Sequence, residues 1–89
     1  MENVLIIDDS MLQAAQLRSI IKDDYDVTIV ETAEDGLEYA NTGNYSLILL
    51  DVIMPGMDGF MLLKKLQEED VTRHIPVILI TSLADIQNE

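Results

Sequence analysis

The sequence predicts an α/β fold, in which helices cover both faces of a parallel β-sheet. Three apolar runs, VLII, LILL and VILI, recur along the chain, and turn or polar residues bound each of them. Continuous apolar runs of this length are typical of parallel strands that are buried on both faces. Segments with apolar residues at helical spacing separate the runs, as right-handed strand–helix–strand crossovers require.

The first predicted strand covers residues 3–7 and ends at the acidic pair Asp8-Asp9. Ser10 follows, with Gln13 three positions later, and this spacing predicts a capping box at the start of a helix. The apolar side of that helix is expected to consist of Ala14, Leu17 and Ile21.

The second predicted strand covers residues 26–31, and its Thr28 and flanking acids favour a position at the edge of the sheet. Thr32 is a typical N-cap, and Glu34 and Asp35 place negative charge in the first turn of the next helix. This helix is expected to run to about Thr42. Gly43 is then expected to close it in the left-handed conformation.

The third predicted strand covers residues 46–50, so that Asp51 is the first residue at its carboxyl end. Pro55, Gly56 and Gly59 predict a loop, and residues 60–67 predict a third helix that buries Leu62, Leu63 and Leu66. The fourth strand is Val77 to Ile80, followed by Thr81. Ser82 would cap a fourth helix. We expect one domain over residues 1–89.

Composition narrows the classes of partner. The formal net charge of −12 argues against direct binding of nucleic acid or of anionic lipid, because both require a basic surface. Without cysteine, the chain has no disulfide and no thiolate metal site. No apolar run is long enough for a signal peptide or a membrane span, so a cytoplasmic protein is expected.

Acidic side chains follow two of the predicted strands. If those strands are neighbours, Asp8, Asp9 and Asp51 converge at the carboxyl edge of the sheet, where open α/β sheets bind their ligands. Like charges at close range repel, and a hard divalent cation with oxygen ligands, such as Mg²⁺, would compensate them. A metal-neutralised aspartate can attack phosphorus, and the Thr81 hydroxyl could donate to a phosphoryl oxygen.

Three segments, IIDDS, LILLDVIMPGMDG and IPVILITS, carry a resemblance to a known family. In their order and spacing, the sequence resembles the receiver domain of two-component response regulators over essentially its whole length. The resemblance implies a flavodoxin-like fold with strand order 2-1-3-4, an Mg²⁺ site and phosphorylation by a histidine kinase or phosphotransfer protein. The implied roles are Asp51 as phosphoacceptor and Mg²⁺ ligand, Asp9 as direct Mg²⁺ ligand, Asp8 as holder of a metal-bound water, Ile53 as carbonyl ligand, and Thr81 as phosphoryl contact.

The sequence also departs from that family. Its members continue through a fourth helix, a fifth strand that carries a lysine for the phosphoryl group, and a fifth helix, and the 89 residues contain none of these. We therefore expect a truncated receiver whose phosphorylation is slow or incomplete. The Val77 to Ile80 strand then becomes an apolar sheet edge, which predicts a homodimer or higher oligomer through that edge.

Three classes of function remain open. The first is a phosphoryl-accepting signalling domain, which is not a turnover enzyme and reacts only with phosphodonors. The second is an interaction or dimerisation module that keeps the scaffold but has impaired phosphoryl chemistry. A phosphohydrolase is the weakest, because such enzymes generally have a second acid two residues after the nucleophile, where this sequence has Ile53.

Overall fold

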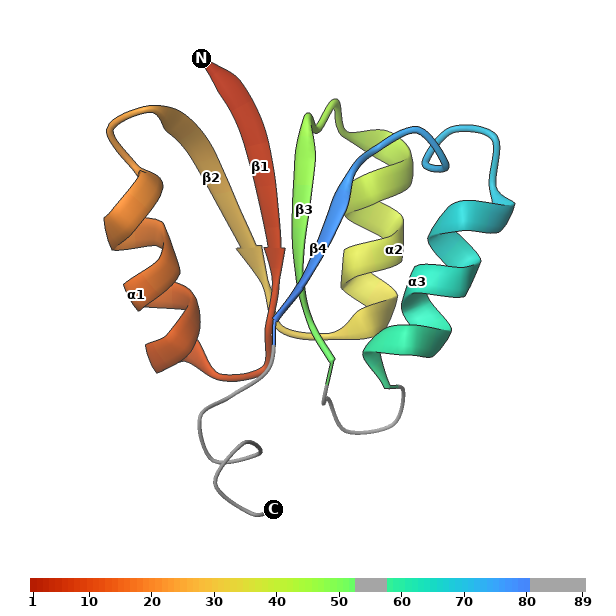
Figure 1. Cartoon of the computed structure of the whole chain (residues 1–89), viewed down its shortest axis with the longest axis horizontal. Coiled ribbons are helices and arrows are strands. Elements are labelled where there is room, and N and C mark those ends of the chain that lie inside the picture. The colour runs from red at the N-terminus through yellow and green to blue at the C-terminus, as the bar shows by residue number, and fades with distance from the viewer. Residues whose placement is uncertain (53–57, 81–89) are drawn as a thin grey trace.

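A single sheet with helices on both faces organises the described part of the molecule (Figure 1). The structure is a computed structural model, and it describes residues 1–52 and 58–80. Its elements are β1 (Glu2–Ile7), α1 (Met11–Ile21), β2 (Tyr25–Val30), α2 (Ala33–Thr42), β3 (Leu47–Asp51), α3 (Gly59–Glu68) and β4 (Val77–Ile80). The α/β prediction is confirmed. Each predicted strand and each of the first three predicted helices is present, with bounds that differ from the predicted ones by at most one residue.

The described strands form a parallel sheet in the order β2-β1-β3-β4, which confirms the predicted order. α1 covers one face of this sheet, while α2 and α3 cover the other face (Figure 1). Alternate residues of a strand point to opposite faces. Accordingly, Leu5 and Ile7 pack towards α2 and α3, whereas Val4 and Ile6 pack towards α1.

The two faces are covered to different extents. On the α2 and α3 side, Leu62 and Leu66 of α3 are buried and Leu63 is partly buried, as predicted. On the α1 side, only Ala14 of that helix is buried, while Leu17 and Ile21 are partly buried against the sheet. Within residues 1–52 and 58–80, one helix therefore covers the α1 face, whereas two helices cover the opposite face.

The expectation for Gly43 is wrong. Its φ of −93° and ψ of 179° are extended rather than left-handed, although its N–H still donates to the carbonyl of Tyr39 at 2.7 Å. A Cβ at this position would clash with Cε2 of Tyr45 and lie 2.9 Å from the carbonyl oxygen of Tyr39, so the close approach of the aromatic ring explains the glycine. A side chain is excluded here by packing and not by the sign of φ.

The segment between α3 and β4 contains a buried hydrogen-bonding side chain. Thr72 is 1% exposed, and its hydroxyl donates to the carbonyl of Leu66 at 2.6 Å, near the end of α3. This bond satisfies a carbonyl that has no partner within the helix. The loop thereby holds α3 against the entry to β4.

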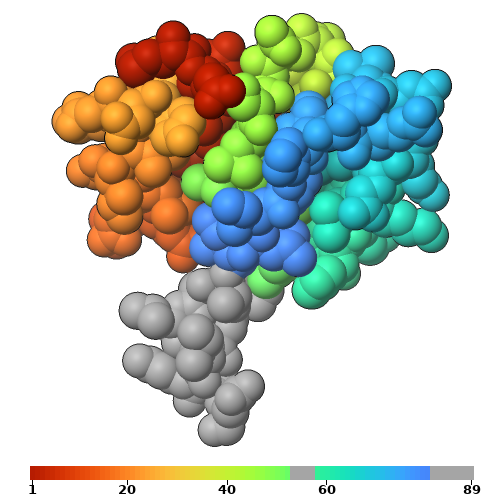
Figure 2. All heavy atoms as spheres, turned by 45° about the horizontal axis from the view of Figure 1, so that its top comes forward, coloured from red at the N-terminus to blue at the C-terminus, as the bar shows by residue number. Residues whose placement is uncertain are grey.

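β4 forms one edge of the described sheet, because it pairs only with β3. Ile78 and Leu79 are 52% and 37% exposed, and they point to opposite faces of the strand. The segment lies open on the surface in Figure 2, where β4 is blue. Among the described residues, no helix is both long and apolar enough to cross a membrane.

Candidate functional site

The register of β1 and β3 brings three carboxylates together. Ile7 is paired with Leu50, so Asp8 and Asp51 occupy equivalent positions at the carboxyl ends of adjacent strands. Each lies one residue beyond a side chain that faces α2 and α3, so both point towards the α1 face. One carboxylate oxygen from each of Asp8, Asp9 and Asp51 lies within 4.8 Å of the others. The predicted convergence of the acids is confirmed.

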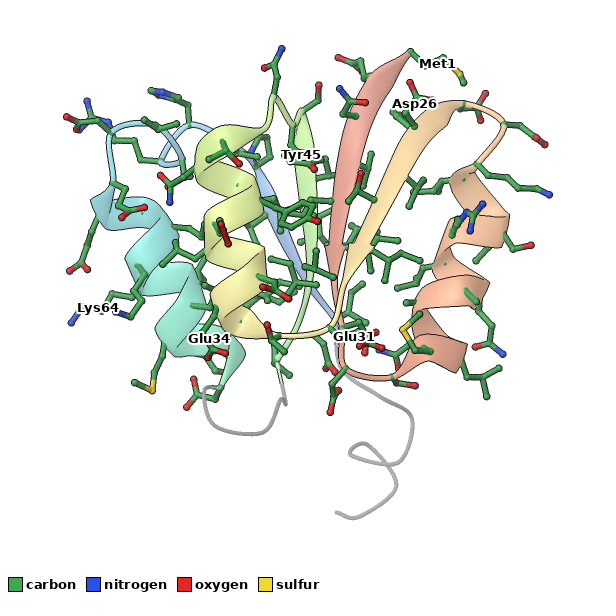
Figure 3. The ribbon with its side chains drawn as sticks, turned by 180° about the vertical axis from the view of Figure 1, so that it is seen from behind. Met1, Asp26, Glu31, Glu34, Tyr45 and Lys64 are labelled. Atoms are coloured by element: carbon green, nitrogen blue, oxygen red, sulfur yellow. The ribbon has the colours of Figure 1, made fainter. Side chains whose placement is uncertain are left out.

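The three acids differ in their surroundings. Asp8 and Asp51 are 1% and 6% exposed, whereas Asp9 is exposed. Glu31 and Glu34 lie at the same end of the sheet, as Figure 3 shows, and they add negative charge there. A compact group of buried and exposed carboxylates favours a small cation that is coordinated partly by protein oxygens and partly by water.

The first turn of α1 holds Asp8 in place. The N–H of Ser10 donates to Oδ1 of Asp8 at 2.8 Å, and Nε2 of Gln13 donates to Oδ2 at 2.6 Å. The predicted capping box is therefore only half formed. The hydroxyl of Ser10 accepts from the backbone N–H of Gln13 at 3.2 Å, but the Gln13 side chain turns to Asp8 instead of to Ser10.

The start of α3 packs directly against the end of β3. Gly59 donates its N–H to the carbonyl of Val52 at 2.8 Å, and Asp58 caps the helix by accepting from the N–H of Met61 at 2.8 Å. A Cβ on Gly59 would lie 2.5 Å from Cα of Val52 and 2.6 Å from the carbonyl oxygen of Asp51. The missing side chain of Gly59 thus allows α3 to support the backbone that carries Asp51.

Two predicted site residues, Ile53 and Thr81, lie outside the described residues, as does the predicted helix after Ser82. Lys64 and Lys65 lie on the exposed surface of α3, and Figure 3 shows Lys64 pointing away from the sheet. Sequence reasoning identified all three acids but missed the side-chain role of Gln13. A capping box already accounted for a glutamine three residues after Ser10, so the sequence offered no reason to expect a hydrogen bond from the Gln13 side chain to Asp8.

The oxygen donors fit Mg²⁺. A hard ion of this kind takes one or two carboxylates together with water molecules, and the site offers carboxylate oxygens without nitrogen or sulfur ligands from the described residues. Asp9 is the exposed acid and is open to a direct contact. The buried Asp8, whose two oxygens already accept protein hydrogen bonds, fits contact through water.

Comparisons with known proteins agree with this geometry. The family model described as response regulator receiver domain matches residues 4–89. The cyclic-nucleotide phosphodiesterase regA of Dictyostelium discoideum is 42% identical over 84 residues, covering 91% of this chain and 11% of that protein. The response regulator PleD of Caulobacter vibrioides is 43% identical over 83 residues, covering 90% of this chain and 18% of that protein.

Among solved structures, the N-terminal domain of a response regulator receiver protein from Methanoculleus marisnigri JR1 is similar, with a TM-score of 0.86 and 26% identity. The match covers 99% of this chain and 76% of that structure. The chain therefore spans less than a fifth of the two curated relatives, and about three quarters of this solved domain.

Proposed function

The chain belongs to the response regulator receiver domain family, and on this basis we propose that Asp51 accepts a phosphoryl group in a reaction that requires Mg²⁺. Receiver domains in general interact with histidine kinases or phosphotransfer proteins, and we propose such a protein as the phosphodonor. The observation that carries the proposal is the convergence of three carboxylates at the carboxyl edge of the sheet, within 4.8 Å.

The proposed transfer is a displacement at phosphorus. An Asp51 carboxylate oxygen forms the new bond to phosphorus, while the bond from phosphorus to the donor breaks and the donor leaves with its electron pair. Mg²⁺, when bound, neutralises the acids and the phosphoryl oxygens together. The protein supplies a nucleophile that β3 and Gly59 hold in place. Beside it lie Asp9, the proposed direct metal ligand, and Asp8, which is proposed to contact the metal through water. The carbonyl of Ile53 and the hydroxyl of Thr81 are further proposed contacts.

Incubation with acetyl phosphate and Mg²⁺ tests this function. We expect intact mass spectrometry to show one added phosphate, which disappears when EDTA replaces the metal. A protein that stays unmodified after prolonged incubation would favour the interaction module instead.

Mg²⁺ alone is expected to stabilise the fold, because it binds the native acid cluster and not the unfolded chain. At about 100 times its Kd, the ion should add roughly 2.7 kcal/mol to the free energy of unfolding. Asp9→Ala should remove most of the rise in Tm, because it deletes the proposed direct ligand. Asp8→Ala should remove less, since that acid is proposed to act through water. Thermal unfolding in Ca²⁺-free buffer, with and without Mg²⁺, measures these shifts in Tm. If the Tm of the parent protein is the same in both buffers, a formed Mg²⁺ site is excluded.

A second candidate function is self-association, and the exposed edge of β4 favours it. β4 carries no charged residue, and its apolar Ile78 and Leu79 are exposed on both faces. By contrast, the opposite edge strand, β2, carries Asp26 and Thr28. An unpaired apolar edge invites pairing with another chain. We propose that a second copy pairs β4 with β4 about a two-fold axis and so joins the two sheets.

Light scattering after size exclusion tests the dimer. We expect Ile78→Lys to yield a monomer, and Val71→Lys to leave the dimer intact, because Val71 is similarly exposed but lies outside β4. Ile78 is a better site than the half-buried Ile80, where lysine would also disturb packing against the sheet. Added salt should strengthen association, because each copy carries a net charge of −12. A compact monomer at tens of micromolar in high salt would refute this interface.

A further inference from the structure

The side chain of Gln13 connects α1 to the buried acid of the site. Its Nε2 donates to Oδ2 of Asp8 at 2.6 Å, while the N–H of Ser10 donates to Oδ1 at 2.8 Å. Because Asp8 is 1% exposed, these protein donors take the place that bulk water would have around its carboxylate. We propose that Gln13 is a positioning residue, which fixes the carboxylate of Asp8 and thereby sets the affinity of the site for Mg²⁺. The inference rests on the proposed function.

The two bonds act on different oxygens of the same carboxylate. Rotation of that group would break both bonds, so Ser10 and Gln13 together fix the plane of the Asp8 carboxylate. An ionised carboxylate has about four lone-pair positions, and these donors occupy two of them. About two positions remain for water molecules that hydrate a bound ion. The orientation of Asp8 is thus set before the ion arrives.

The chemistry of an amide suits this role. A donor to an ionised carboxylate forms a strong, charge-assisted hydrogen bond. Glutamine supplies that donor without adding a positive charge, so the three acids keep the full negative charge that attracts a cation. A lysine or arginine at this position would bind Asp8 but would compete electrostatically with the metal.

Helix capping does not require the Gln13 side chain. The cap of α1 is formed by the hydroxyl of Ser10 and the backbone N–H of Gln13, which any residue at this position would supply. The side chain is half-buried and reaches back five residues to Asp8. Its contact therefore serves the acid and not the helix end.

Calorimetric titration with MgCl₂ at constant ionic strength tests this role in the complete chain. Gln13→Met keeps the length of the side chain and removes the donor. We expect its Kd for Mg²⁺ to be about 10- to 100-fold weaker, as is usual when a group that orients a metal ligand is lost. The matched control is Gln16→Met, because Gln16 is exposed on α1. We expect its Kd for Mg²⁺ to equal that of the parent protein. A merely structural role would lower Tm and leave the Kd unchanged, and that result would overturn the inference.

A second variant and a second measurement serve if Gln13→Met does not fold, as judged by circular dichroism. Gln13→Asn keeps the amide on a shorter side chain that reaches Asp8 less well, so its Kd for Mg²⁺ should be weaker than that of the parent protein. In ¹H–¹⁵N spectra of the parent protein, the side-chain NH₂ signal of Gln13 should move when Mg²⁺ is added. This signal is identified by its absence from the spectrum of Gln13→Asn. A Kd equal to that of the parent, or a signal that ignores the metal, would overturn the inference.

Mg²⁺ titrations of the parent protein and of Asp9→Ala distinguish a missing metal site from a missing role of Gln13. If the parent binds Mg²⁺ and Asp9→Ala does not, the proposed metal site stands, and an unchanged Kd in Gln13→Met refutes only the role of Gln13. If the parent itself binds no Mg²⁺, the metal site of the proposed function and the inference about Gln13 both fail.

Discussion

Asp51→Asn is expected to abolish covalent phosphate incorporation from acetyl phosphate. The amide is a far weaker nucleophile than the carboxylate, and it also removes one of the three negative charges that attract Mg²⁺. The parent protein should gain one phosphate by intact mass, and the variant should gain none after the same incubation. The two side chains have nearly the same size, so the asparagine should fit the space of the 6% exposed Asp51. Circular dichroism would verify that the fold is retained.

Asp58→Asn provides the matched control. Asp58 lies seven residues further along the chain and is exposed, and its Oδ1 accepts from the N–H of Met61 as the N-cap of α3. Asparagine caps helices about as well as aspartate, so stability should change little. Phosphorylation should proceed as in the parent. Phosphate that persists in Asp51→Asn and is lost in Asp58→Asn would reassign the acceptor.

Gly59→Ala is expected to produce the largest loss of stability among the substitutions considered. The added Cβ would lie 2.5 Å from Cα of Val52 and 2.6 Å from the carbonyl oxygen of Asp51, so α3 or the end of β3 must move. Overpacking against backbone that cannot rotate away should cost roughly 2–3 kcal/mol. For a domain of this size, the corresponding fall in Tm is about 10–20 °C. Thermal unfolding followed by circular dichroism measures it.

The same substitution should weaken Mg²⁺ binding, because the displaced backbone carries Asp51. Gly36→Ala is the control, since the three atoms nearest to its Cβ all belong to the side chain of Ile7, with Cδ1 at 2.7 Å. A side chain shifts at lower cost than backbone does, and alanine is the better helix former within α2, by about 1 kcal/mol. We expect a smaller change in Tm and an unchanged Mg²⁺ affinity. Equal effects of the two substitutions would contradict a specific role of Gly59 in supporting the site.

Much of the fold and of the site could be predicted from local sequence patterns. The apolar run before Asp51 identified a buried strand, because continuous apolar runs of this length are typical of strands covered on both faces. The N-caps Ser10 and Thr32 located two helix starts, since a side-chain acceptor satisfies otherwise unpaired backbone N–H groups. Gly43 shows the limit: its place after α2 was predicted, but the reason for it is the ring of Tyr45.

The sequence by itself determined which acids follow which strands, and it placed Asp8, Asp9 and Asp51 at strand ends through the lengths of the apolar runs. Only the tertiary structure decided that these acids meet, because the pairing of Ile7 with Leu50 sets the register and the face on which Asp8 and Asp51 lie. It likewise decided that the Gln13 side chain serves Asp8. A hydrogen-bond partner depends on distances across the fold, and the spacing of residues along a chain does not contain those distances.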